Sequence, residues 1–368
     1  MDRPAVAVLF GGRSSEHSIS SATAGGVLRA IDRDRFRVIP IGITRDGAFV
    51  LEDDDPDKFA LDKDRLPEVV DNGTRIVWPD STLTRELKVT DAAGTRSLGE
   101  VDVVLPILHG RFGEDGTIQG MLELLGIPYA GAGVLMSALG MDKNVAKRVL
   151  KAAGVPVVPW VAVTRADLAR QRDLWERRIR ALGLPVFVKP NQAGSSVGVS
   201  KVSEWGELDG ALDVAFAEDS VVLVEQAIVG REVECGVLQG RDGAPPRVSV
   251  AGEIVVSGRE FYDFEAKYLD APGIDLICPA ELHDGELAEM HRIAAMAFEA
   301  IGGQALARVD FFFTGTEFYV NEVNTMPGFT PISMFPTCWI ASGMTYPELI
   351  SDLVDGALER AGSARGAA

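Results

Sequence analysis

The chain has 368 residues, which is long enough for two or three domains with ordinary hydrophobic cores. Hydrophobic residues make up 46% of it and charged residues 24%, a composition typical of a soluble globular protein. The formal net charge of -18 argues against a surface for nucleic acid or anionic membrane, so a phosphate ligand must be met by local cations or backbone N–H groups.

The cysteines, the histidines and the N-terminus argue against further kinds of protein and site. Cys235, Cys278 and Cys338 are far apart with no CxxC pair, which predicts reduced thiols in a cytoplasmic protein. The four histidines lack metal spacing, which argues against a histidine-zinc site. No secretory leader is evident, and no segment approaches the roughly 18 continuous apolar residues of a membrane span. We therefore expect a cytoplasmic protein with neither membrane nor nucleic acid as partner.

The first third alternates strand and helix patterns. Residues 5–10 and 37–43 are apolar strand runs, and 14–31 has helical spacing, which together predict a parallel α/β sheet. Residues 52–89 are acidic and irregular and predict loops, edge strands and one short helix. A strand at 101–108 and apolar residues at helical spacing over 118–125 complete a first domain near Gly133.

A second unit begins with a predicted helix at 142–153 and a charged helix at 166–182. Residues 186–201 predict a strand, a glycine-serine loop and a second strand, and 221–225 predicts another strand. The loop is not a Walker motif, but its N–H groups and hydroxyls could cover phosphates, with Lys189 at the strand end supplying a charge. Taken alone, it is more typical of an ordinary hairpin turn. Gly131-Ala132-Gly133 has no third glycine of a dinucleotide fingerprint, so we reject a nicotinamide dehydrogenase.

The third unit carries the most informative pattern. Residues 308–313, a short polar turn and residues 318–324 predict a β-hairpin. If its loop has an odd number of residues, such as 314–316, one face gathers Arg308, Asp310, Glu322 and Asn324. Two carboxylates and a carboxamide suit Mg²⁺, and the arginine would stabilise developing negative charge. The alternative is an amphipathic hairpin with a solvated polar face. Helices near 286–301 and 346–360 follow, and a frayed tail is expected from Ser363.

Five blocks of this sequence resemble, in order, those of the D-alanine:D-alanine ligase family of ATP-grasp enzymes. They are residues 11–20, 109–120, 194–201, 261–268 and 321–330. The resemblance implies a three-domain ATP-grasp fold of the α/β class, with an N-terminal Rossmann-like parallel-sheet domain and an α+β C-terminal part. The expected domains are a substrate domain at 1–133, a central subdomain at 134–228, and a C-terminal subdomain with the Mg²⁺ hairpin at 229–368.

The resemblance also implies an activity, the ATP-dependent joining of two D-alanines through a D-alanyl phosphate. The products would be ADP, phosphate and D-alanyl-D-alanine for peptidoglycan precursors. It implies ATP as substrate, two Mg²⁺ ions that Mn²⁺ can replace, and a homodimer, and it leaves activation by K⁺ open. A different ATP-grasp ligase would share the hairpin but not the blocks around Glu16, His109 and Tyr268. A nucleotide-binding regulator without catalysis would be expected to have lost some of the hairpin's polar residues, and none is lost.

Matching positions assign roles for ATP and metal as implications of the resemblance. The implied metal ligands are Asp310, Glu322 and Asn324. Phosphate contacts fall to Lys143, Lys189 and Lys267, together with the loop residues Ser195 and Ser196. Adenine would lie against Glu225, Gln226 and Ile228, and Glu232 would bind the ribose. The hinge departs from many relatives, because Gln226 and Ala227 replace a lysine and a bulkier residue.

The same comparison assigns the substrate positions. Glu16 would hold the ammonium of the first D-alanine with His109 nearby, and Ser195 and Tyr268 would connect to Glu16. Ser333 and the backbone of Met334 would bind the carboxylate of the second D-alanine, and Arg308 and the Gly328 N–H would stabilise the oxyanion. Relatives that make D-alanyl-D-lactate often have histidine where this chain has Tyr268, so we expect a dipeptide product. Segments 193–200 and 257–275 are expected to be lids that order when ATP binds.

Overall fold

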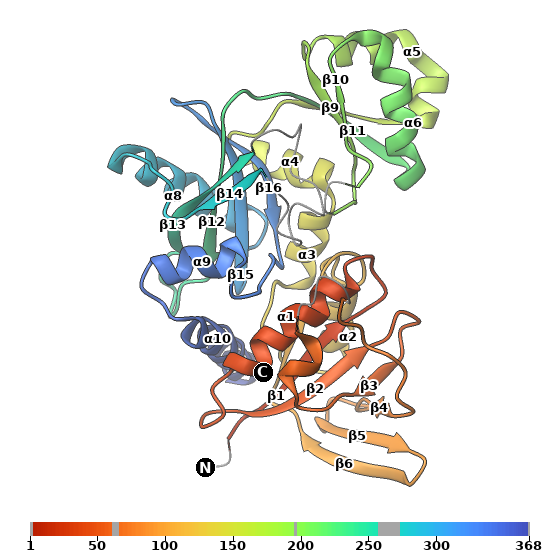
Figure 1. Cartoon of the computed structure of the whole chain (residues 1–368), viewed down its shortest axis with the longest axis vertical. Helices are drawn as coiled ribbons and strands as arrows, with labels where there is room; N and C mark the ends of the chain where they lie inside the picture. The colour runs from red at the N-terminus through yellow and green to blue at the C-terminus, as the bar shows by residue number, and fades with distance from the viewer. Residues whose placement is uncertain (1–2, 61–65, 195–196, 257–272, 367–368) are drawn as a thin grey trace.

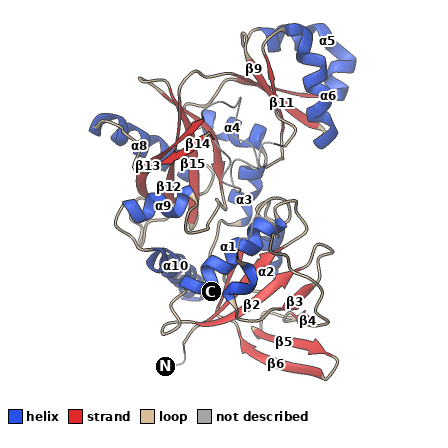
Figure 2. Ribbon diagram, viewed as in Figure 1, coloured by secondary structure: helices blue, strands red, loops and turns tan. Residues whose placement is uncertain are grey.

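The computed structural model describes residues 3–60, 66–194, 197–256 and 273–366. Figures 1 and 2 show an elongated molecule with helices packed against several separate sheets. None of the helices in the described ranges is long and apolar enough to cross a membrane. The predicted lid at 257–275 lies outside the described residues except for its last three.

The N-terminal sheet has the order β3 (Phe49–Leu51), β2 (Arg37–Ile43), β1 (Ala5–Gly11), β7 (Val103–Ile107). Strand β1 is parallel to both β2 and β7, and β3 adds an antiparallel edge. Helices α1 (His17–Ala30) and α10 (Tyr346–Gly366) cover one face, and helix α2 (Thr117–Leu124) and a small sheet cover the other. All seven residues of β1 are buried, as a parallel strand covered on both faces requires. The predicted parallel α/β opening is therefore confirmed.

The small sheet and one short helix account for the irregular segment 52–89. The sheet consists of β4 (Arg75–Val77), β5 (Glu86–Asp91) and β6 (Gly94–Glu100), all antiparallel. The helix is a single 3₁₀ turn, η1 (Pro56–Phe59), which Asp55 caps by accepting the Asp57 N–H. The predicted edge strands and single short helix are therefore confirmed.

The central sheet is antiparallel, in the order β10 (Ser200–Val202), β9 (Val186–Pro190), β11 (Val221–Gln226), β8 (Trp160–Thr164). Helices α5 (Arg165–Arg180) and α6 (Leu208–Glu218) pack on its apolar face, and the short η2 (Trp205–Glu207) precedes α6. A reciprocal capping box between Thr164 and Asp167 begins α5. The pairing of β9 with β10 confirms the predicted hairpin around the glycine-serine loop.

The C-terminal sheet has five antiparallel strands, in the order β14 (Ile274–Ile277), β13 (Arg247–Val256), β12 (Arg231–Leu238), β15 (Leu306–Phe313), β16 (Phe318–Asn324). Helix α8 (Asp284–Ala300) packs on one face, and α9 (Met334–Ala341) packs against β12 and β13. Between the central and N-terminal sheets run α3 (Val134–Met141) and α4 (Lys143–Ala152) (Figure 1). Helices α3, α6 and α9 were not predicted.

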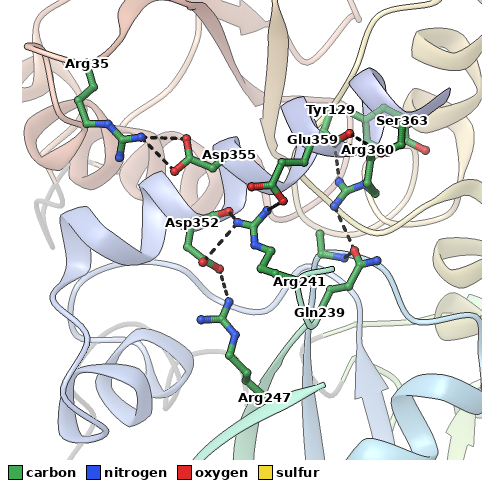
Figure 3. Close-up of polar contacts among 11 residues, drawn as sticks. Arg35, Tyr129, Gln239, Arg241, Arg247, Asp352, Asp355, Glu359, Arg360 and Ser363 are labelled. Carbon is green, nitrogen blue, oxygen red and sulfur yellow. Dashed lines mark hydrogen bonds and ion pairs between the residues drawn. The ribbon is translucent and has the colours of Figure 1, made fainter. Parts of the chain in front are cut away.

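Helix α10 connects the C-terminal end of the chain to the N-terminal sheet region, and Figure 3 shows the polar contacts that hold it. Its Asp355 forms an ion pair with Arg35 at 2.9 Å. Its Arg360 donates to the Tyr129 carbonyl and to Gln239 Oε1, both at 3.1 Å. One helix therefore contacts both the N-terminal sheet region and the loop after β12.

The extent of α10 corrects one prediction. The helix continues to Gly366, and the Ser363 hydroxyl donates to the Glu359 carbonyl at 3.1 Å. The frayed tail expected from Ser363 is thus helical as far as residue 366, although Gly362 and Ser363 are exposed. Alanine and arginine favour the helix without an apolar face, so the helix extends beyond its apolar spacing.

Candidate active site

A cavity of about 1040 Å³ lies where the three large sheets meet. Every predicted site residue that the structure describes lines it, namely Glu16, His109, Lys143, Lys189, Glu225, Gln226, Ile228, Glu232, Arg308, Asp310, Glu322, Asn324, Gly328, Ser333 and Met334. Ser195, Ser196, Lys267 and Tyr268 lie outside the described residues, and their roles stay predictions.

The hairpin β15–β16 presents Arg308, Asp310, Glu322 and Asn324 to this cavity, but the predicted reason was wrong. The connecting loop, 314–317, has four residues because Phe313 pairs with Phe318. With an even loop, simple alternation would place Glu322 on the face opposite Asp310.

A β-bulge restores the shared face. Phe311 pairs with Val320, but the next pair is Asp310 with Glu322, so Asn321 is an extra residue in β16. The additional residue reverses the alternation of every side chain that follows it, and the polar residues return to the cavity side. Asn321 also lines the cavity, and its Oδ1 accepts a hydrogen bond from Lys189 Nζ at 3.3 Å.

The hairpin's charged groups contact one another closely. Arg308 donates from Nε to Asp310 Oδ1 and from Nη2 to Oδ2, both at 2.7 Å, and its Nε lies 3.0 Å from Glu234 Oε2. Asn324 Nδ2 donates to Asp310 Oδ2 at 2.9 Å. Burial opposes the charge on Arg308, but these carboxylates outweigh burial and raise its pKa well above the ordinary value. The guanidinium is therefore a permanent positive charge at the cavity wall.

The donors on this hairpin fit a hard cation. Among the described residues, no three histidine, cysteine or carboxylate side chains are arranged to hold a metal, and the predicted set contains only two carboxylates with one carboxamide. Facing carboxylates at Asp310 and Glu322 with an amide beside them supply the oxygen ligands that Mg²⁺ prefers. Such a set leaves coordination positions for substrate oxygens.

Lys143 connects the hairpin to the glycine-serine loop. It is the first residue of α4, directly after the cap Asp142, whose side chain accepts the Val145 N–H. Its Nζ donates to the Ala193 carbonyl at 2.9 Å and lies 3.4 Å from Glu322 Oε2. An ammonium in this position faces both elements that are expected to surround phosphates.

Sequence reasoning missed Lys147, which belongs to a buried charge cluster. Lys147 Nζ lies 3.1 Å from Glu225 Oε1, and Lys189 Nζ lies 2.7 Å from Glu225 Oε2. Lys147 is only 2% exposed, and burial lowers its pKa to about 8 despite the attraction of Glu225. The available signal was its spacing, because Lys147 lies one turn after Lys143 on the buried side of α4.

The Glu225 carboxylate is thus shared by two ammonium groups. Burial would raise its pKa, but Lys147 and Lys189 outweigh burial and lower it, so the carboxylate is ionised. Glu225 lines the cavity together with Gln226 and Ile228, and their contact with adenine stays a prediction.

Glu16, which lines the cavity, occupies the N-cap position of α1. A Cβ added to Gly110 would lie 2.9 Å from Glu16 Oε2, and one added to Gly194 would lie 3.1 Å from it. The carboxylate therefore lies against both glycines, between the loop after β7 and the glycine-serine loop.

His109 is buried beside Glu16. Its Nδ1 lies 3.2 Å from the Met326 carbonyl and 3.8 Å from Glu114 Oε1, while its Nε2 has no hydrogen-bond partner within the described protein. Burial lowers the pKa of His109, but Glu114 and Glu16 more than offset this and raise it. A buried ring nitrogen without a protein partner at a cavity wall is suited to a ligand.

Another part of the cavity wall is the start of α9. Ser333 is its N-cap residue, and the Ser333 hydroxyl lies 2.7 Å from Thr330 Oγ1 and accepts the Thr330 N–H at 3.2 Å. A Cβ at Gly328 would lie 3.2 Å from Ser333 Oγ, which places the two predicted residues side by side. A helix N-terminus favours a carboxylate through its free N–H groups.

Comparisons with known proteins identify the family. Family models described as "D-ala D-ala ligase N-terminus" and "D-ala D-ala ligase C-terminus" match residues 5–132 and 149–355. Curated relatives named D-alanine--D-alanine ligase include one from Paenarthrobacter aurescens (49% identity, 97% of this chain, 96% of the relative) and one from Mycobacterium sp. strain KMS (51%, 97% of each chain).

Solved structures extend the similarity to the fold. The VanG D-Ala:D-Ser ligase from Enterococcus faecalis has a TM-score of 0.83 at 34% identity, covering 97% of this chain and 100% of that one. The D-alanine-D-alanine ligase from Coxiella burnetii has a TM-score of 0.81 at 33% identity, covering 100% and 97%. With two family models that together match most of the chain and relatives near 50% identity over almost its full length, this protein belongs to the D-alanine–D-alanine ligase family of ATP-grasp enzymes.

Proposed function

We propose that this enzyme joins two D-alanines at the expense of ATP, through a D-alanyl phosphate, and supplies D-alanyl-D-alanine for peptidoglycan synthesis. The observation that carries the proposal is a single cavity whose wall holds lysines, an arginine-carboxylate hairpin, Glu16 with His109, and the N-terminus of α9. We further propose domain boundaries near residues 133 and 228, so that the cavity lies where three domains meet.

In the first step, the carboxylate of one D-alanine attacks the γ-phosphorus of ATP, and ADP leaves. Lys143 and Lys189 are suited to offset the repulsion between these anions, because both ammoniums line the cavity beside the glycine-serine loop. Glu16 would hold the substrate ammonium, with His109 next to it. Asp310, Glu322 and Asn324 would hold Mg²⁺, or Mn²⁺ in its place, which when bound screens the phosphate charges.

In the second step, the amine of another D-alanine attacks the acyl phosphate, and phosphate leaves after an oxyanion has formed. Arg308 is suited to stabilise that oxyanion because its charge is permanent and its position is fixed by Asp310. The N–H of Gly328 would assist it. Ser333 and the N–H of Met334 would bind the carboxylate of the incoming D-alanine at the N-terminus of α9.

The test is phosphate release from ATP and Mg²⁺ with D-alanine alone, with L-alanine, and with D-alanine plus D-serine or D-lactate, identifying products by mass spectrometry. D-Alanyl-D-alanine from D-alanine alone is the expected result. A product formed only with D-serine or D-lactate would show that the enzyme has another substrate specificity within the family. Intact ATP binding without turnover would favour a regulator. Adding K⁺ to the same assay tests monovalent activation, and light scattering tests the proposed homodimer.

A further inference from the structure

Two cysteines far apart in sequence meet behind the cavity wall. Cys278 follows strand β14 and is partly exposed, whereas Cys338 lies within α9 and is completely buried. Their sulfur atoms are 3.7 Å apart and share a hydrogen bond. Both thiols are free in this structure.

The pair is directly connected to the substrate cavity. Cys338 follows Met334 by four residues on α9, so both side chains lie on one face of the helix. Met334, Cys338 and Ile254 form one buried cluster, against which Cys278 packs. Since Met334 and Ile254 also line the cavity, the two thiols lie immediately behind its wall.

We propose that Cys278 and Cys338 are a modification site at which a peroxide forms a reversible disulfide. In the first step the Cys278 thiolate attacks hydrogen peroxide, an S–O bond forms, the O–O bond breaks, and hydroxide leaves to be protonated to water. In the second step Cys338 attacks the sulfenic acid, an S–S bond forms, and the sulfenic oxygen leaves as a second water. The two thiols lose two electrons, and the peroxide gains them.

The two sulfurs differ in the way the first step requires. Their hydrogen bond lowers the pKa of Cys278 and raises that of Cys338, so the thiol that meets solvent is also the one that ionises. The third cysteine, Cys235, is completely buried, and burial raises its pKa well above the usual value. Cys235 should therefore stay reduced under the same treatment.

The disulfide would alter the site because it shortens the distance between two elements. A disulfide has an S–S bond of about 2.05 Å, so the segment after β14 and helix α9 must approach or rotate. The start of α9 carries Ser333 and Met334. On the proposed assignment of these residues to the second D-alanine, displacement of the helix should raise the KM for D-alanine roughly tenfold. This consequence rests on the proposed function, whereas formation of the disulfide does not.

The experiment treats the full-length enzyme with hydrogen peroxide, alkylates the remaining thiols after denaturation, and identifies peptides by mass spectrometry. We expect a peptide in which Cys278 and Cys338 are joined with the loss of two hydrogens, and alkylated Cys235. Dithiothreitol should restore both free thiols and the original KM. Cys278→Ser should prevent both the cross-link and the change in KM, while Cys235→Ala should leave both intact.

Each contrary result is informative. Recovery of both cysteines alkylated, or of Cys278 as sulfinic acid without a cross-link, would overturn the modification site. A cross-link with unchanged KM would overturn its effect on the cavity. If the untreated enzyme did not ligate D-alanine, the proposed function would fail, and the mass-spectrometric result would still decide whether the disulfide forms.

Discussion

Lys147 gives the sharpest test of the charge arrangement in this site. It is 2% exposed, and burial lowers its pKa from 10.5 to about 8. A lysine whose pKa is lower in the folded chain than in the unfolded chain destabilises the fold when it is protonated. The unfolded chain binds more protons between pH 8 and pH 10.5, so this group's contribution to stability rises with pH in that window.

The magnitude follows from the shift. A change from 10.5 to about 8 corresponds to about 3 kcal/mol at roughly 1.4 kcal/mol per pKa unit. Lys147→Met removes this contribution and leaves the other titrating groups in place. The free energy of unfolding of the wild type, minus that of the variant, should therefore increase by about 3 kcal/mol between about pH 7 and pH 10.5.

Urea denaturation of both proteins at several pH values measures this difference. Lys151→Met is the matched control for the loss of a lysine, because Lys151 lies on the same helix but is exposed. A flat difference for Lys147→Met across the window would refute the argument that burial dominates the ionisation of this lysine. A second measurement is the KM for ATP. In Lys147→Met, Glu225 forms an ion pair with Lys189 only, so the KM for ATP should rise about tenfold.

Three further predictions concern contacts elsewhere. Gly194→Ala places a Cβ 3.1 Å from the Glu16 carboxylate and should raise the KM for D-alanine about tenfold without lowering the melting temperature. In the control Gly206→Ala the added Cβ meets nothing within 4 Å, so this variant should be neutral in steady-state assays. Equal KM values for the two variants would contradict the position of Glu16. Arg308→Lys loses the two-bond contact with Asp310 and should lower kcat about a hundredfold, and an unchanged kcat would rule out its oxyanion role. Arg360→Met removes the donor to the Tyr129 carbonyl, while Gln239 Oε1 keeps the Ala305 N–H. It should lower the free energy of unfolding by about 1–3 kcal/mol in urea, against less than about 1 kcal/mol for the exposed Arg35→Met. Equal losses would show that α10 is not held through Arg360.

Local sequence patterns determined much of this protein. The continuous apolar run of β1 is typical of a strand buried on both faces, and the structure buries all of it. The strand–loop–strand pattern before residue 201 and the hairpin strands after Arg308 were evident from alternation and turn residues. The sequence blocks were sufficient to indicate the family, and every site residue they identified within the described ranges lines one cavity.

The tertiary structure decided features that local periodicity cannot predict. Alternation along β16 places Glu322 correctly only because Asn321 is bulged, and a bulge depends on how the two strands pair rather than on either strand alone. Lys147, Glu225 and Lys189 come from a helix and two strands, so no spacing in the sequence could show that one buried carboxylate lies between two ammoniums. Such contacts form when separate elements pack together, and their effect on the pKa of Lys147 arises from the burial that packing produces.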